Sequence, residues 1–112
     1  MTSKTEQQVM AFLNAVCGKQ NLVLNPDREM VREIAEGLRE NYNRMGYFCC
    51  PCREAWEDKK KDRDIICPCS YCKPDIEEFG QCFCGLFVSE EVRASGKELS
   101  SIPDRRDDNL YP

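Results

Sequence analysis

The sequence predicts a small, mainly α-helical, metal-dominated domain: short helices and loops folded around a metal centre, with little or no sheet. A chain of 112 residues favours one domain. Apolar residues recur at helical spacing through residues 1–46, whereas 47–85 holds eight of the nine cysteines and only short helical patterns. Elements this short bury too little apolar surface to fold alone. We therefore expect a helical scaffold (1–46), a cysteine-rich lobe (47–88), and a short helix with a tail (89–112).

Two helices are predicted in the scaffold. Ser3 followed by Glu6 reads as a capping box, and Gly18 is a left-handed stop signal. Asn25 with Pro26 is a second start signal, and Gly46 a second stop. The apolar stripes between these signals are Val9, Phe12, Leu13 and Val16, then Val31, Ile34, Leu38 and Tyr42. Cys17 lies beside the first stripe, and we interpret it as a buried small hydrophobe.

The rest of the chain shows weaker helical signals. Residues 53–64 are compatible with two or three helical turns, and residues 73–80 with about one. Ser89 is a plausible cap for another short helix. The charged, proline-broken tail is expected either to wrap the surface or to fray. Trp56 and Phe79 are interpreted as packing residues.

Composition excludes several classes of protein. The chain has no histidine, which rules out Ser-His-Asp and Cys-His nucleophile sites and mixed Cys/His zinc fingers. The net charge of −4 argues against nucleic acid as a partner. The polar start shows neither an export signal nor a membrane span, so we expect a cytoplasmic protein. Cysteines in that compartment indicate metal binding or redox catalysis.

Three Cys-x-Cys pairs are the most specific feature: residues 50–52, 67–69 and 82–84. Zinc needs ligand sulfurs roughly 3.8 Å apart, which chains reach with two to four intervening residues. An extended Cys-Pro-Cys instead spans about 6.6 Å, because proline favours extended backbone. Such spacing suits an iron–sulfur cubane better than one zinc ion, although other rotamers would bring the sulfurs closer. Six thiols are two more than a Cys₄ cluster needs, which leaves a pair for redox chemistry.

In their order and surroundings, these motifs resemble the catalytic (beta) chain of ferredoxin:thioredoxin reductase, whose signature is CPC…CPC…CHC. "GYFCCPCR", "DIICPCSY" and "CFCGLFVS" carry the resemblance, which covers roughly residues 30–92. It implies that a 4Fe–4S cluster is held by four thiols, those of Cys50, Cys67, Cys69 and Cys82. It also implies that Cys52 and Cys84 form a redox-active disulfide, with Cys52 as the exposed thiol that attacks the substrate.

The sequence departs from the family pattern in three ways. Its spacers are 14 and 12 residues, where the plant-type pattern is longer and then shorter. Phe83 replaces the histidine of CHC, so we expect an altered pH dependence. Cys49 and Cys72 are additional thiols, interpreted here as non-ligands, although Cys72 makes a zinc-like C-x₂-C with Cys69.

The resemblance further implies ferredoxin as electron donor and thioredoxin, or a similar disulfide protein, as acceptor. A small accessory subunit accompanies some members of the family. Arg53 is either a charge that lowers the Cys52 pKa or a solvated helix residue. The run Lys59, Lys60 and Lys61 is either a docking site for an acidic ferredoxin or a solvated face.

Two other functions are compatible with the cysteines. One is a non-enzymatic Cys₄ zinc or iron–sulfur module that binds another protein, which would leave Cys52 and Cys84 unused. The other is an electron carrier that has the cluster but no disulfide turnover. Substitution of Cys52 by serine would abolish disulfide reduction in a reductase and leave a carrier unaffected.

Overall fold

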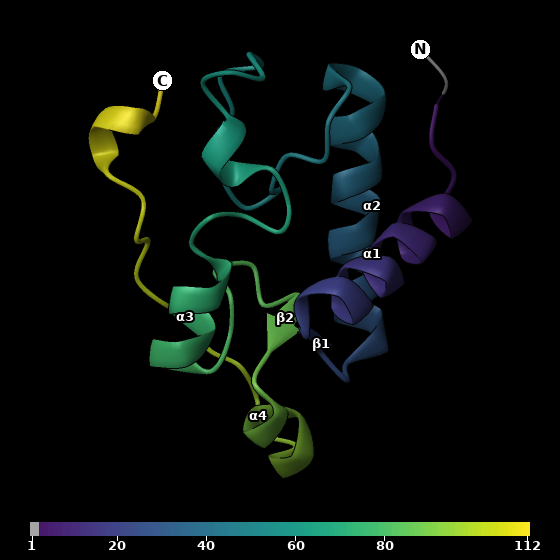
Figure 1. The fold of residues 1–112 in the computed structure, drawn as a ribbon, viewed down its shortest axis with the longest axis vertical. Helices are drawn as coiled ribbons and strands as arrows, with labels where there is room; N and C mark the ends of the chain where they lie inside the picture. The colour runs from purple at the N-terminus through teal and green to yellow at the C-terminus, as the bar shows by residue number, and fades with distance from the viewer. Residues whose placement is uncertain (1–2) are drawn as a thin grey trace.

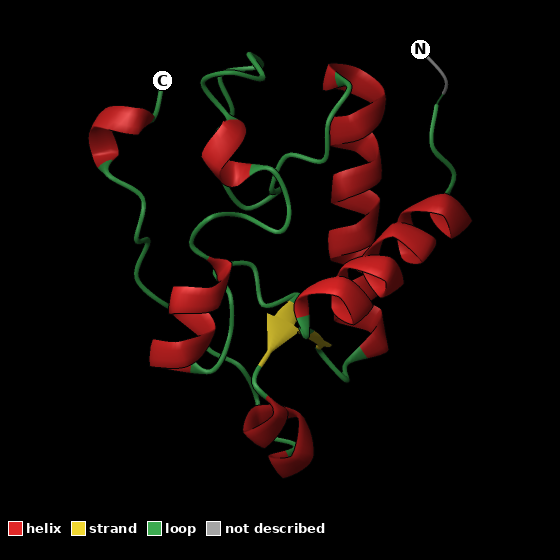
Figure 2. Cartoon of the chain, in the orientation of Figure 1, coloured by secondary structure: helices red, strands yellow, loops and turns green. Residues whose placement is uncertain are grey.

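The computed structural model describes residues 3–112 and is mainly helical, as predicted (Figures 1 and 2). The helices are α1 (Glu6–Gln20), α2 (Arg28–Met45), α3 (Cys72–Phe79) and α4 (Glu90–Ser95), with 3₁₀ turns at Arg63–Ile65 and Asp108–Leu110. Strands β1 (Val23–Leu24) and β2 (Phe87–Val88) pair antiparallel, with Leu24 opposite Phe87. In Figure 1 this small sheet lies between the α1–α2 pair and α3. No helix in the described part of the chain is both long and apolar enough to cross a bilayer.

Helix α1 starts and ends two to three residues later than predicted. Thr5, rather than Ser3, caps it, and its hydroxyl accepts from the backbone N–H of Gln8 while the Gln8 side chain accepts from Thr5 N–H. The helix continues through Gly18 and ends at Asn21, whose φ of 55° is left-handed. Asparagine tolerates this conformation because its side chain is short and polar.

Helix α2 is capped by Asp27, not by Asn25 as predicted. The Asp27 carboxylate accepts from the backbone N–H groups of Glu29 and Met30. Asn25 is buried and instead donates its amide to the carbonyl of Gly85, at 2.9 Å. The residue therefore ties the start of α2 to the chain just after the third Cys-x-Cys pair. Gly46 ends α2 at a φ of 88°, as predicted.

The helix expected over residues 53–64 is absent; this segment is a loop that ends in the 3₁₀ turn. The carboxylate of Asp62, fully buried, accepts from the backbone N–H groups of Trp56 and Glu57 and from the hydroxyl of Tyr47. Because a side chain takes the backbone donors that a helix would use, the segment folds as a loop. Glu57 has a left-handed φ of 62°, which also interrupts a helix.

The two short C-terminal helices match their signals. Helix α3 ends at Gly80, and the Ser89 hydroxyl caps α4 by accepting from Val92 N–H. The tail wraps the surface: Arg105 pairs with Asp75 and Glu78, and buried Arg106 pairs with Asp64. Trp56 and Phe79 are exposed rather than packed, which corrects that interpretation. Both still touch the tail, Trp56 by donating its indole N–H to the Leu110 carbonyl and Phe79 beneath the Arg105 guanidinium.

The main core joins the helices to the cysteine-rich region. Its buried residues include Leu13 of α1, Leu38 of α2, Leu86 just before β2, and Phe87 of β2. A second cluster, at the other end of α2, contains Tyr47, Cys49, Cys50 and Ile65. The scaffold and the cysteine-rich region thus share buried surface, so the helices hold the cysteine segments in place.

Gly37 is the point where α2 meets the first Cys-Pro-Cys segment. A Cβ there would lie 2.7 Å from the Cβ of Pro51, a ring atom that cannot swing aside. We expect Gly37→Ala to lower the melting temperature, because overpacking costs about 1–3 kcal/mol. This cost outweighs the roughly 1 kcal/mol that alanine gains in helix propensity.

The matched control for Gly37→Ala is Gly18→Ala in α1, where nothing lies within 4 Å of an added Cβ. That variant should gain up to about 1 kcal/mol in free energy of unfolding. Thermal unfolding of the two variants separates packing from propensity. If both are stabilised, α2 does not buttress the Cys-Pro-Cys segment.

Candidate functional site

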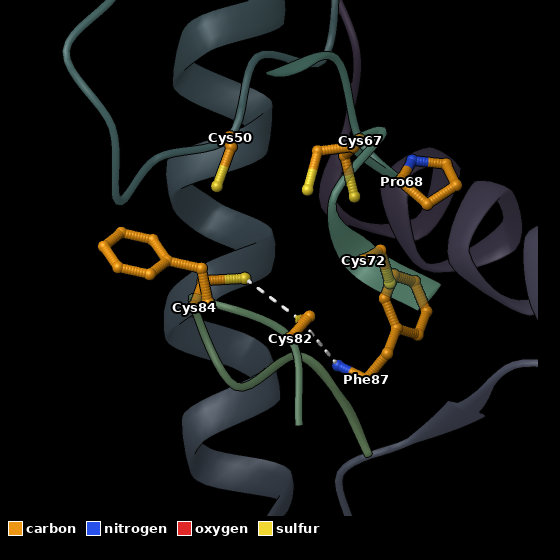
Figure 3. Close-up of a pocket in the computed structure, with 9 residues that line it drawn as sticks. Cys50, Cys67, Pro68, Cys72, Cys82, Cys84 and Phe87 are labelled. Atoms are coloured by element: carbon orange, nitrogen blue, oxygen red, sulfur yellow. Dashed lines mark hydrogen bonds between the residues drawn. The ribbon is translucent and has the colours of Figure 1, made fainter. Parts of the chain in front are cut away.

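The three Cys-x-Cys segments converge on one pocket. It is lined by Cys50, Cys67, Pro68, Cys69, Cys72, Cys82, Phe83, Cys84 and Phe87. Figure 3 shows the sulfur atoms of Cys50, Cys67 and Cys84 directed toward the space between these segments. The lining contains thiols, aromatic rings and a proline, without any charged side chain.

Backbone hydrogen bonds hold the segments in register. Cys50 N–H donates to the Ile65 carbonyl at 2.9 Å, and Cys67 N–H donates to the Phe48 carbonyl at 2.7 Å. These bonds lay the first two Cys-Pro-Cys segments side by side. The third segment is fixed by Cys82 N–H, which donates to the Phe87 carbonyl at 2.9 Å. Since β2 follows at once, pairing with β1 anchors this segment to the scaffold.

In the second Cys-Pro-Cys segment, the Cys67–Pro68 peptide bond is cis. Both Cys67 and Cys69 line the pocket.

The sulfur of Cys82 has a thiol neighbour and a backbone donor. Its Sγ lies 3.8 Å from the Sγ of Cys84 and accepts from the backbone N–H of Phe87 at 3.3 Å (Figure 3). Hydrogen bonding to the thiols of Cys72 and Cys84 lowers the pKa of Cys82 well below its usual value. Backbone donors to a sulfur are typical of metal-bound thiolates, whose charge they stabilise.

Cys52 and Cys84 differ in exposure. Cys52 is exposed and outside the pocket lining, whereas Cys84 is half-buried and lines the pocket. Hydrogen bonds with the thiols of Cys50 and Cys84, aided by the charge of Arg53, lower the pKa of Cys52. All nine cysteines are free thiols in this structure. The arrangement combines an exposed thiol of lowered pKa, that of Cys52, with a less exposed thiol, that of Cys84, in the pocket lining.

Arg53 is not a solvated helix residue. Its side chain is fully buried, is ion-paired with Asp104, and donates to the hydroxyl of Tyr111 at 2.9 Å. Burial raises the pKa of the Cys69 thiol, and the charge of Arg53 acts against this increase. The cation therefore acts on both Cys52 and the pocket.

The three remaining cysteines differ in burial and in whether they line the pocket. Cys49 is fully buried in the second core cluster and does not line the pocket. Cys17 is only half-buried, packed against the main core, so its expected full burial is not observed. Cys72, at the start of α3, is buried and does line the pocket.

The thiols of the pocket form a donor set for a soft, sulfur-bound group. Thiolates without oxygen or nitrogen ligands suit iron–sulfur clusters or zinc, and do not suit magnesium or calcium. Within residues 3–112, no group of three or more cysteine, aspartate or glutamate side chains is arranged to hold a metal ion. The chemistry of the lining fits a cluster, and the six thiols that line the pocket include the four expected ligands, Cys50, Cys67, Cys69 and Cys82.

Sequence reasoning missed the residues that fix Arg53. Tyr71, Asp104 and Tyr111 surround its guanidinium, and the last two are 51 and 58 residues away along the chain. No local pattern marks such partners, because each contact depends on how the tail is routed. The sequence offered one signal for a role of Arg53, which is its place directly after the first Cys-Pro-Cys.

The fold and the pocket together define a class of protein: a small helical domain that folds three Cys-x-Cys segments onto one thiol-lined pocket. A family model described as the ferredoxin thioredoxin reductase catalytic beta chain matches residues 1–104. The chain belongs to this family, and the match extends beyond residues 30–92, where the resemblance was found. The family's description makes the chain a reductase, names ferredoxin and thioredoxin, and implies an iron–sulfur cofactor. A search of curated proteins found no match.

Proposed function

We propose that this chain is a ferredoxin-dependent disulfide reductase that uses a 4Fe–4S cluster and the thiol pair Cys52 and Cys84 to reduce thioredoxin or a similar disulfide protein. One observation carries the proposal. Three Cys-x-Cys segments meet at one pocket, with Cys84 in its lining and Cys52 exposed outside it. The family's description agrees with this function.

Four thiols would hold the cluster: those of Cys50, Cys67, Cys69 and Cys82, all of which line the pocket. When bound, a cluster of this kind supplies single electrons for reduction of the Cys52–Cys84 disulfide. Phe83 and Phe87 cover the same pocket with apolar surface and restrict the access of water to it. The N–H of Phe87 stabilises negative charge on the Cys82 sulfur.

The order of the exchange steps with the partner follows from the exposure of the two thiols, because Cys52 is more exposed than Cys84. The thiolate of Cys52 attacks one sulfur of the partner disulfide; the other partner sulfur leaves and takes up a proton. Cys84, 3.8 Å from Cys82 and half-buried, is shielded from the partner and attacks the Cys52 sulfur. The second partner thiol is then released. Two electrons and two protons have passed to the partner, and Cys52 and Cys84 are joined.

Metal and sulfide analysis tests the proposal directly. The protein is purified without oxygen, and iron, zinc and acid-labile sulfide are measured per chain. About four irons and four sulfides per chain are expected for a Cys₄ cubane. The same sample, given reduced ferredoxin and oxidised thioredoxin, should produce thioredoxin dithiol.

A zinc-binding structural module is the second candidate, favoured by the place of Cys72 in the pocket. Cys69 and Cys72 have the two-residue spacing that zinc sites use. One zinc per chain, no sulfide and no turnover would support this candidate and contradict the reductase.

The basic run Lys59–Lys61 leads to a prediction on docking. These residues are exposed in an otherwise acidic chain, and the Lys61 ammonium lies 4.5 Å from the centre of the Trp56 ring. We expect replacement of all three lysines by glutamate to slow reduction by ferredoxin about tenfold or more at low salt. The difference should shrink as salt screens the charges.

The matched control for the docking prediction is Lys97→Glu, an exposed lysine near the C-terminal end of α4. Stopped-flow reduction at several salt concentrations separates the two variants. Equal rates for the triple variant and the wild type at low salt would show that the lysine run is only a solvated loop.

A further inference from the structure

Arg53 joins three parts of the molecule that are far apart in sequence. It directly follows Cys52, its guanidinium lies 4.3 Å from the centre of the Phe83 ring, and it is bound to Asp104 of the tail. A fully buried arginine is costly unless its charge and its donors are matched. Here one nitrogen, Nη1, makes both polar contacts. The remaining nitrogens, Nε and Nη2, have no hydrogen-bond partner in the protein.

Aromatic rings take the place of the missing acceptors. The guanidinium lies 4.3 Å from the Phe83 centroid and 5.2 Å from the Tyr71 centroid, distances typical of cation–π contacts. Phe83 is the middle residue of the third Cys-x-Cys segment, between Cys82 and Cys84. Its ring therefore links the arginine after Cys52 to the segment that carries Cys84.

The tail fixes the other edge of the guanidinium. Tyr111 accepts from Arg53 and donates to Asp104, so the three side chains form a closed set. Arg106 lies 4.5 Å from the Tyr111 ring and pairs with Asp64, which ties this part of the tail to the body. Most of the tail lies beyond residue 104, where the family match ends.

We propose that Arg53 is a positioning residue: held by the tail and pressed on Phe83, it fixes Cys52 relative to Cys84 and so sets how readily the two sulfurs join. This inference rests on the proposed function. Cys52 is exposed, whereas the side chain of the next residue, Arg53, is fully buried and anchors the chain directly after Cys52. Greater freedom of one sulfur lowers the effective concentration of the pair.

Two variants keep the positive charge and disturb only the geometry. Arg53→Lys retains the charge but loses the planar fork that both stacks and hydrogen-bonds. Phe83→Leu retains an apolar lining but removes the ring. In each we expect the equilibrium constant for forming the Cys52–Cys84 disulfide to fall about tenfold, a shift of about 30 mV toward easier reduction. If both residues act through the same Arg53–Phe83 contact, the equilibrium constant of the double variant should be little lower than that of either single variant.

The equilibrium is measured in glutathione buffers on the iron-loaded full chain, without oxygen and at one pH. Two glutathione thiols reduce the Cys52–Cys84 disulfide to two thiols and yield one glutathione disulfide. Alkylation followed by mass spectrometry counts the free thiols at each position. Arg39→Lys is the control, since it makes the same change in an arginine whose ion-pair partner, Glu36, lies on the same helix, so the tail and the Phe83 ring are left intact.

The outcomes are distinct. A fall in the equilibrium constant for Arg53→Lys and Phe83→Leu, with Arg39→Lys near the wild type, supports the inference. A lower melting temperature in Arg53→Lys with an unchanged constant overturns it, because the residue is then only structural. If Arg53→Lys does not accumulate as folded protein, Phe83→Leu decides alone: a lower equilibrium constant supports the inference, and an unchanged one overturns it. A wild type that never joins Cys52 to Cys84 overturns the proposed function, and this inference with it.

Discussion

Replacing Cys52 by serine is expected to abolish disulfide reduction and leave the bound iron unchanged. A serine hydroxyl is a far poorer nucleophile than a thiolate, so turnover should fall roughly 10³-fold or more, the scale seen when an enzyme loses its nucleophile. Cys52 does not line the pocket, so the four proposed ligands are untouched. Thioredoxin reduction by reduced ferredoxin and iron content per chain are the two measurements.

The matched control is Cys49→Ala, three residues earlier in the chain. Cys49 is fully buried among Tyr47, Cys50 and Ile65. Its loss should cost about 1 kcal/mol of stability through the small cavity it leaves, while turnover stays near the wild-type value. Full activity in Cys52→Ser would refute the reductase and favour an electron carrier. Loss of iron from Cys52→Ser would instead place Cys52 among the ligands.

Removal of the metal is expected to unfold much of residues 47–88. This region has one α-helix of eight residues, a 3₁₀ turn and the two-residue strand β2, and its three Cys-x-Cys segments meet at the cysteine pocket. Ligand binding that exists only in the folded state contributes directly to folding free energy. We expect chelation under reducing conditions to lower the melting temperature by more than about 10 °C, since 1 kcal/mol corresponds to roughly 4–8 °C.

Hydrogen exchange shows where the metal-free protein opens. Amides of residues 47–88 should exchange quickly, whereas those in the middle of α1 and α2 stay protected, because these helices pack on each other around Leu13 and Leu38. The control is the loaded protein treated with reductant alone. Unchanged exchange in 47–88 after complete removal of iron would show that the region folds without a metal.

The helical start and stop signals were largely readable from the sequence, within two or three residues. Gly46, Gly80 and Ser89 act where predicted. Ser3 and Asn25 did not become caps because Thr5 and Asp27 offer the same chemistry nearer the apolar stripes. When several good capping residues stand close together, local pattern alone does not choose among them.

The helix predicted over residues 53–64 failed for a tertiary reason. The residue types in "REAWEDKKKDRD" do not disfavour a helix. The helix is lost because the carboxylate of Asp62 is buried, and its position depends on Tyr47 and on the turn at Arg63–Ile65. Of the two alternatives for Arg53, the solvated helix residue is wrong as well, because its partners Asp104 and Tyr111 belong to the tail and bury it. Both misassignments arise where a charged side chain is buried by distant residues.

The sequence by itself determined the kind of protein this is: mainly helical, rich in thiols, and a member of a reductase family recognisable from three Cys-x-Cys pairs. These properties depend on residue type and short-range spacing, which local physics expresses directly. Only the tertiary structure decided which thiols meet. It brings Cys50, Cys72 and Cys84 to one pocket, excludes Cys49, and closes the tail over Arg53. The reason is that a contact between distant residues depends on the path of the whole chain between them, and no window of the sequence contains that path.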